Sequence, residues 1–186
     1  MKRLFDVILS FAALCVLFLP LAIIALLIRT TSRGPAIHWS DRVGRDNEIF
    51  KMPKFRTMRA DAPQVATHLM DNPDAYRVPF GSFLRKSSLD ELPQLWSVLK
   101  GDMSIVGPRP ALYNQEDLIA LRTEKGVHRL IPGITGWAQI NGRDDLPIPV
   151  KVEHDVHYLN HQSMRLDLKI LFLTVWRVLR REGVRG

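Results

Sequence analysis

The sequence has 186 residues, enough for one domain, and it carries 26 Lys and Arg against 19 Asp and Glu, a net charge of +7. This excess of positive charge suits a polyanionic partner, such as nucleic acid, a nucleotide or an anionic membrane surface, without choosing among them. The single cysteine, Cys15, excludes an intrachain disulfide and therefore a secreted disulfide scaffold, so a reducing, cytosol-facing location is the simpler expectation.

The first predicted element is an apolar segment from Val7 to Ile28 that contains no charged residue. Its length, about 22 residues, corresponds to roughly 33 Å of helix and could cross a bilayer. It is not typical of a cleaved signal peptide, because the apolar region is long and residues 29–33 lack a small-residue cleavage pattern. We therefore expect a membrane segment that is retained.

Basic residues flank this segment on both sides, so the positive-inside rule draws both of its ends towards the cytoplasm. These residues are Lys2 and Arg3 before the segment and Arg29, Arg33, Arg42 and Arg45 after it. Pro20 removes one backbone donor and favours a bend within the segment. A re-entrant helix broken at Pro20 and a single kinked span both agree with these features, and both stay open at this point.

The next elements are short. Residues 33–60 mix glycines and prolines with apolar stretches at 37–39 and 48–51, which predicts a small β-hairpin. Residues 60–80 are polar and contain three prolines, which predicts a helix of a few turns within a loop. A helix is then predicted over about 90–100, ended by a glycine.

The second half of the chain is predicted to alternate helices with extended pieces. Residues 107–110 must be extended because of their two prolines, and a helix follows over about 114–124. A short extended piece is predicted at 137–140 between glycine turns, followed by a helix over about 151–160. The last helix, 166–181, has an apolar stripe opposite basic residues, so it would either pack on the domain or lie in the membrane interface.

The adjacent carboxylates Asp90 and Glu91 precede Pro93, a residue that a helix tolerates only in its first turn, so they are predicted near a helix N-terminus. There an ionised aspartate is favoured, and it could attack phosphorus or hold a metal, with Arg85 close by to attract phosphates. The alternative is a plain capping box made by Ser88 and Glu91, and from these residues alone the capping box is the more common arrangement.

Arg109 stands between two prolines that stiffen the backbone around a fork-shaped donor, which predicts a phosphate clamp. The alternative is a turn with a solvated arginine. Further basic residues could meet phosphates, lipid headgroups or only water: Lys51, Lys54, Arg56, Arg59 and Arg143.

Three histidines, His154, His157 and His161, fall at helical spacing. No matching cysteine or supporting pattern accompanies them, so we expect a solvated or interfacial face and not a metal site. The sequence also lacks a Walker-type loop and a dinucleotide fingerprint, so phosphate binding is expected from side chains and helix ends.

Four motifs together resemble those of the bacterial sugar transferases, which are monotopic polyprenyl-phosphate phosphoglycosyl transferases. The motifs are residues 54–58, 88–96, 101–110 and 132–143. They occur in the family's order, and the resemblance covers nearly the whole chain. Three departures concern specificity or packing more than the carboxylate pair: Pro53 replaces a usual aromatic, Ser97 replaces a usual asparagine, and residues 147–150 lack a tryptophan often found before Lys151.

The resemblance implies an α/β, mostly helical fold. Residues 1–32 would form a re-entrant membrane helix broken at Pro20. Residues 33–186 would form a cytosolic catalytic domain with a short β-hairpin and with amphipathic helices that rest on the membrane interface. The expected location is the bacterial inner membrane, with the catalytic domain on its cytoplasmic face.

By the same resemblance, Asp90 would attack the β-phosphate of a UDP-sugar, release UMP and carry the phospho-sugar until polyprenyl (undecaprenyl) phosphate takes it. Mg²⁺ would neutralise pyrophosphate charge and be held by Asp90 and Glu91, and Glu91 would help with the metal or with activating the acceptor. Arg109 would hold a phosphate. Weaker candidates for phosphate contact are Lys54, Arg56, Arg85 and Arg143, and Asp155 and Tyr158 also match the family pattern.

The expected partners are the UDP-sugar, the polyprenyl phosphate and the lipid bilayer, without nucleic acid and with homo-oligomerisation left open. The chain resembles the short form of the family, which implies an N-acetylated deoxyamino sugar and a role in surface-glycan assembly. Two alternatives remain: a non-enzymatic membrane-bound adaptor that binds anionic lipid or nucleic acid through its basic surface, and a UDP-sugar hydrolase or direct glycosyl transferase.

Overall fold

The computed structural model describes residues 1–59, 76–142 and 146–180, and these are mostly helical. The helices are α1 (Lys2–Thr31), α2 (Gly81–Lys86), α3 (Gln94–Lys100), α4 (Glu116–Glu124), α5 (Trp137–Asn141), α6 (Ile148–His161) and α7 (Met164–Arg180). The strands are β1 (Ile37–Val43), β2 (Ile49–Phe55), β3 (Ser104–Val106) and β4 (Gly133–Thr135). Short 3-10 turns are η1 (Arg45–Asn47), η4 (Leu89–Glu91) and η5 (Val127–Arg129).

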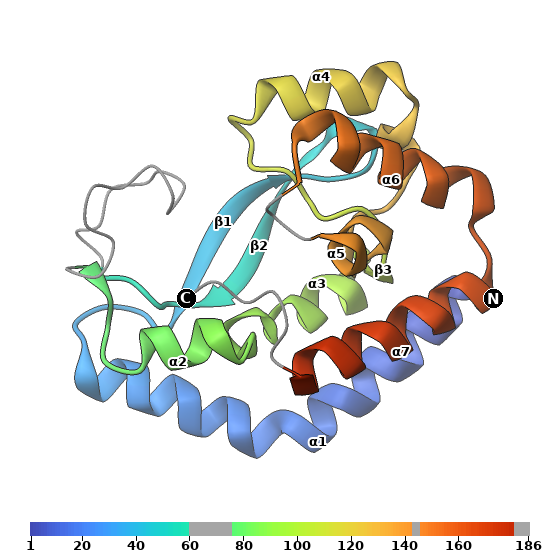
Figure 1. Ribbon diagram of the computed structural model, residues 1–186. Helices are drawn as coiled ribbons and strands as arrows, with labels where there is room; N and C mark the ends of the chain where they lie inside the picture. The colour runs from blue at the N-terminus through green and yellow to red at the C-terminus, as the bar shows by residue number, and fades with distance from the viewer. Residues whose placement is uncertain (60–75, 143–145, 181–186) are drawn as a thin grey trace.

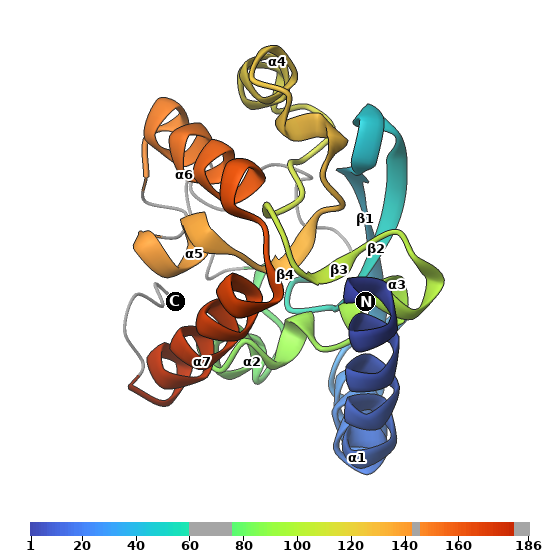
Figure 2. The same cartoon turned by 90° about the vertical axis from the view of Figure 1, so that its right-hand side faces the viewer.

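Helix α1 lies along one side of the molecule and is curved, so that its middle bows outward. Figure 1 shows its convex side facing outward, with α2 and α3 next to its concave side and α4 and α6 furthest from it. Figure 2, turned by 90°, shows that α1 extends further towards the bottom of the view than α2 and α7 do. The molecule therefore consists of an outlying apolar helix and a globular part, by which we mean the described residues after α1.

Helix α1 is continuous, with Pro20 inside it. The predicted break at Pro20 is thus a bend within one helix, because a helix can lose the single hydrogen bond that proline removes and still continue beyond it. Only Asp6, Ser10 and Ile28 of α1 are buried, and the helix is long and apolar enough to cross a membrane by length and composition.

The N-terminal end of α1 is fixed to the globular part by polar contacts. The Arg3 guanidinium donates to the carbonyl of Leu99 at the end of α3, over 2.8 Å. The buried Asp6 carboxylate accepts hydrogen bonds from the Ser104 hydroxyl at 2.8 Å and from the Ile105 N–H at 3.2 Å. A buried carboxylate needs such partners, so this end of α1 has a defined register against β3.

The C-terminal end of α1 is fixed to the same globular part. Ile28 is buried in a cluster with Phe55 of β2 and Leu84 of α2. The Arg56 guanidinium donates to the carbonyls of Ser32 and Arg33 just after the helix, which satisfies carbonyl groups that the helix end leaves free. Both ends of α1 therefore dock on one body while its middle stays exposed.

Strands β1 and β2 form the predicted hairpin, which is confirmed as an antiparallel pair. Its register places Trp39 opposite Pro53 and His38 opposite Lys54. Because successive side chains of a strand point to opposite faces, Lys54 shares one face with His38, while Phe55 turns to the other face and packs near α1.

The prediction for residues 131–143 is wrong in detail. The strand is β4, residues 133–135, which pairs in parallel with β3, and residues 137–141 form helix α5. A Cβ atom on Gly133 would lie 2.1 Å from the backbone nitrogen of Gly107, so glycine here permits two strands to approach closely. The glycines indicate this close approach as well as turns, which the sequence alone could not distinguish.

The remaining helices agree with prediction in place and differ at their ends. Helix α4 matches the predicted 114–124, α6 begins three residues before the predicted 151, and the helix predicted from about residue 90 begins at Gln94. Helix α2 was not predicted, and most of the helix expected in 60–80 lies outside the described residues. The main core surrounds β3 and consists of Met52, Val98, Met103, Ile105, Val106, Ile140, Tyr158 and Ile170.

Helix α7 has one face packed on the core and another that exposes apolar side chains, so packing on the domain does not exclude the predicted contact with the membrane interface. Asp167 and Ile170 are buried against the core. The exposed large apolar side chains of this helix are Leu168, Phe172, Val175, Trp176 and Val178. The alternative of packing on the domain is thus confirmed, and the interfacial alternative stays a prediction for the exposed face.

Candidate active site

The two adjacent carboxylates lie in the 3-10 turn η4, between α2 and α3. Ser88 enters this turn with a left-handed backbone (φ 56°) and makes no side-chain cap bond, and the Glu91 side chain is engaged elsewhere. The alternative of a capping box is therefore wrong. Because α3 begins only at Gln94, the helix dipole that was expected to favour an ionised Asp90 acts from a greater distance.

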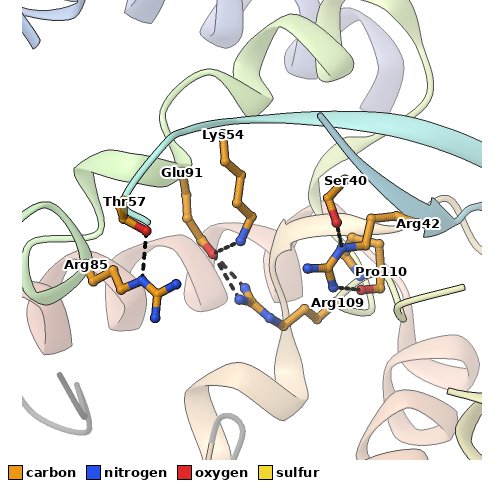
Figure 3. Close-up of polar contacts among 8 residues, drawn as sticks. All are labelled: Ser40, Arg42, Lys54, Thr57, Arg85, Glu91, Arg109 and Pro110. Carbon is orange, nitrogen blue, oxygen red and sulfur yellow. Dashed lines mark hydrogen bonds and ion pairs between the residues drawn. The ribbon is translucent and has the colours of Figure 1, made fainter. Parts of the chain in front are cut away.

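Glu91 lies between two cations that come from distant parts of the chain. Its Oε1 atom is 2.8 Å from Nζ of Lys54 on β2 and 2.9 Å from Nη2 of Arg109, which follows β3. Figure 3 shows the Glu91 side chain between those of Lys54 and Arg109. The structure thus brings together three of the residues that the sequence singled out.

These ion pairs keep Glu91 ionised. Burial by itself would raise the pKa of Glu91, but Arg109 and Lys54 outweigh burial and hold that pKa well below its usual range. Burial lowers the pKa of Lys54, and the charge of Glu91 opposes that shift. The charged Glu91 therefore fixes the positions of two cationic groups.

Asp90 has the opposite environment, although it is the next residue. It is buried, with 9% of its surface exposed, and no hydrogen bond or ion pair joins its carboxylate to another residue in the described part of the chain. Burial and then the Glu91 charge raise the pKa of Asp90 to about 6, against the influence of Lys54, Arg85 and Arg109. Near neutral pH Asp90 is thus an ionised, poorly solvated carboxylate, which is suited to nucleophilic attack.

Two further arginines lie near this group, Arg85 close to Asp90 and Arg42 close to Lys54. Arg85 of α2 donates from Nε to the Thr57 hydroxyl at 2.9 Å, and its charge acts on Asp90. Arg42 of β1 donates to the Ser40 hydroxyl at 3.1 Å and to the Pro110 carbonyl at 3.2 Å. Figure 3 shows all these groups on one side of the hairpin. Three cations thus act on the two carboxylates and Arg42 adds a fourth positive charge near Lys54, so the site can bind a polyanion.

Arg42 was not predicted as a site residue, although its position contained the signal. Arg42 lies four residues after His38, so both side chains share the strand face that also carries Lys54. Once the hairpin register is known, a basic residue on this face is expected near the site. The register depends on long-range pairing, which the sequence shows only through an alternation that is weak in this strand.

The other predicted residues lie elsewhere. Arg56 supports the end of α1 and does not join the Glu91 cluster, and Arg143 lies outside the described residues. Asp155 pairs with Arg122 at 2.6 Å, and the Tyr158 hydroxyl donates to Asp167 at 2.6 Å. Two of the three histidines of α6 take part in ring stacking: His157 lies on Trp137, and His161 lies on His157.

The described residues fit Mg²⁺ bound together with a substrate. They contain no group of three or more His, Cys, Asp or Glu side chains that could hold a metal ion. Mg²⁺ needs no such cage, because it is usually held by one or two carboxylates and by substrate phosphates. Within the described part of the chain, the Asp90 carboxylate has no partner, and Oε2 of Glu91 has one contact, at 3.5 Å from Arg109.

Comparison with known proteins gives a consistent match. The family described as bacterial sugar transferase matches residues 1–181. EpsL of Bacillus subtilis (strain 168), described as an uncharacterized sugar transferase, is 43% identical, and the match covers 100% of this chain and 90% of EpsL.

Two longer relatives are described by their substrates. The UDP-glucose:undecaprenyl-phosphate glucose-1-phosphate transferase of Escherichia coli (strain K12) is 40% identical over 95% of this chain. The undecaprenyl-phosphate galactose phosphotransferase of Salmonella typhimurium (strain LT2) is 37% identical over 98% of this chain. This chain spans only 40% and 41% of these two relatives, respectively.

The environment of Asp90 predicts a pH-dependent cost to stability. Its pKa is raised from 3.8 to about 6, so the native protein binds this proton more tightly than the unfolded chain does. The cost of ionised Asp90 is therefore fully present above about pH 6 and disappears as the pH falls below 3.8. Asp90→Asn should raise the free energy of unfolding by up to ~3 kcal/mol at pH 7.5 and by about half of that at pH 5.

Denaturant unfolding at the two pH values, without divalent cations, measures this gain. Asp117 on the exposed surface of α4 provides the matched control, since Asp117→Asn should give no comparable gain at either pH. A loss of stability in Asp90→Asn, or an equal gain at both pH values, would contradict the account of the buried carboxylate.

Proposed function

The chain belongs to the bacterial sugar transferase family, and from this premise we propose that it transfers a phospho-sugar from a UDP-sugar to polyprenyl phosphate. The observation that supports this reaction most is Asp90, a buried carboxylate that has no partner among the described residues and lies near the cations Lys54, Arg85 and Arg109. A nucleophile next to groups that bind phosphate is what phosphoryl transfer requires.

In the first step, a carboxylate oxygen of Asp90 attacks the β-phosphorus of the UDP-sugar. The bond between this phosphorus and the bridging oxygen breaks, and UMP leaves with that oxygen. The phospho-sugar stays on Asp90 as an acyl phosphate. Arg109 and Lys54 lie where they can neutralise charge on the phosphate oxygens, and Glu91 holds both of them in position.

In the second step, a phosphate oxygen of the polyprenyl phosphate attacks the same phosphorus. The bond from phosphorus to Asp90 breaks, which gives polyprenyl-diphosphate-sugar and restores the Asp90 carboxylate. We propose that Glu91 also helps to activate this acceptor. Mg²⁺, held by Asp90 and Glu91 with the substrate, would supply neutralisation of the pyrophosphate charge.

The sugar that we propose is an N-acetylated deoxyamino sugar, by analogy with members of the family. The relatives in Escherichia coli and Salmonella typhimurium are named for glucose and galactose, so both hexoses belong in any test. A product of this kind would start the assembly of a surface glycan on its lipid carrier.

We propose that α1 enters the bacterial inner membrane and returns to its cytoplasmic face. In support of this, both ends of α1 dock on one globular part, and basic residues flank the apolar segment on both sides. The exposed aromatic side chains Phe83 of α2 and Phe172 and Trp176 of α7 are candidates to rest in the interface beside it.

Release of UMP tests the reaction directly. The purified protein in nanodiscs should release UMP from one or more members of a UDP-sugar panel, in the presence of undecaprenyl phosphate and Mg²⁺. The panel contains UDP-glucose, UDP-galactose and UDP-linked N-acetylated deoxyamino sugars. Asp90→Asn should lower the rate by at least about 10³-fold, because the substitution removes the nucleophile.

Three results would weigh against the proposal. Equal release by Asp90→Asn would exclude Asp90 as the nucleophile, and release of a free sugar phosphate would indicate a hydrolase. If no UDP-sugar in the panel yields UMP, and the protein binds anionic vesicles, the membrane-bound adaptor would be favoured.

The topology can be tested because Cys15 is the only cysteine. In a Cys15→Ala background, one cysteine is introduced either as Arg33→Cys or in a short N-terminal extension. Neither site should react with a membrane-impermeant maleimide in intact spheroplasts, and both should react after lysis. If the N-terminal site reacts in intact spheroplasts, α1 is a single span and the re-entrant proposal is wrong.

A further inference from the structure

Arg122 of α4 and Asp155 of α6 form a buried ion pair that the reaction as described does not use. Nε and Nη2 of Arg122 donate to the same Asp155 oxygen at 2.9 and 2.6 Å. Only 8% of Arg122 and 1% of Asp155 are exposed. Neither residue contacts Glu91, Lys54 or Asp90 in the described part of the chain, so the pair lies outside the group of carboxylates and cations described above.

Arg122 reaches the active site through the backbone of another arginine. Its Nη1 atom donates to the main-chain carbonyl of Arg109 at 2.9 Å. Residues 107–110, which we call the Arg109 loop, are also held by β4, because Gly107 N–H donates to the Thr135 carbonyl and Gly133 N–H donates to the Pro108 carbonyl. Arg122 thus holds the middle of a loop whose start is fixed by a strand.

Stability alone does not explain this buried pair. Replacing a buried ion pair with apolar side chains of similar volume often leaves a protein as stable or more stable, since two charges need not be desolvated. The bond that distinguishes Arg122 from an apolar substitute is the one to Arg109, because a planar guanidinium can donate to Asp155 and to the loop at the same time.

We propose that Arg122 and Asp155 are positioning residues for Arg109, the phosphate clamp. Asp155 orients the Arg122 guanidinium. Arg122 in turn holds the main chain of Arg109, so that the Arg109 side chain meets Glu91 and the donor phosphate. This inference rests on the proposed function. A displacement of about 1 Å in a positioning group can cost on the order of 10²-fold in rate, so a single backbone bond is enough to matter.

The decisive variant removes the pair as a unit. Arg122→Met with Asp155→Leu leaves no unpaired buried charge, so it should fold with a Tm close to that of the original protein. Its kcat/KM for UMP release should fall ~10–100-fold. The matched control is Lys125→Ala with Glu124→Ala, which removes an exposed ion pair at the same end of α4 and should leave kcat/KM within about twofold.

A double-mutant cycle with Arg109→Ala separates positioning from a merely structural role. If the pair acts through Arg109, its removal should have almost no further effect on kcat/KM once the Arg109 side chain is absent. If the two losses multiply, the pair acts on something other than Arg109 and the proposal is wrong.

Hydrogen exchange followed by mass spectrometry tests the same link without catalysis. Amides in residues 107–112 should exchange faster in the Arg122→Met, Asp155→Leu protein, while those of α1 and of the hairpin stay as slow as before. Unchanged exchange in 107–112 would overturn the proposal. Absence of UMP release from the original protein would instead overturn the proposed function, and the exchange measurement would still decide whether the pair holds the loop.

Discussion

The candidate active site depends on the unequal treatment of two adjacent carboxylates. Glu91 takes the direct contacts with Lys54 and Arg109 and stays ionised, whereas Asp90 is buried without a partner in the described part of the chain and its pKa is raised to about 6. When neighbouring acids have environments that push their pKa values apart, they can take different chemical roles. Here one carboxylate organises cations and the other is left reactive. The hairpin, α2 and the Arg109 loop each contribute a cation to this arrangement, so the fold is built around it.

The second constraint is the attachment of α1. Hydrogen bonds to the buried Asp6 carboxylate fix the start of α1, and hydrogen bonds from Arg56 fix its end. The helix therefore has a defined position relative to the active site. For an enzyme whose acceptor is a lipid, such a fixed position would set the height of Asp90 above the membrane. The explanation of Arg56 also changes: a basic residue in a motif that was expected to bind phosphate instead satisfies the carbonyls after α1, as the chemistry of a helix end requires.

Local patterns in the sequence predicted more than long-range ones did. The hairpin, α4, α6 and α7 follow from periodicity and turn residues, and the family motifs pointed to Asp90, Glu91, Lys54 and Arg109 as a group. Arg42 could not be found without the strand register, and β4 could not be separated from a turn because glycine serves both. The contact of Arg122 with the Arg109 carbonyl has no sequence signal, since it joins a side chain to a backbone group 13 residues away.

The central claim is that Asp90 forms a covalent bond to the phospho-sugar, and trapping that species tests it most directly. The protein is mixed with its UDP-sugar and Mg²⁺ without acceptor, quenched in acid and digested for mass spectrometry. The account predicts that the peptide containing Asp90 gains the mass of one phospho-sugar and loses it when undecaprenyl phosphate is added before the quench, whereas Asp90→Asn gains nothing. A control acyl phosphate, carried through the same acid handling, shows whether such a species survives. If the control survives, and UMP is released in an amount equal to the protein while the Asp90 peptide stays unmodified, the account is contradicted.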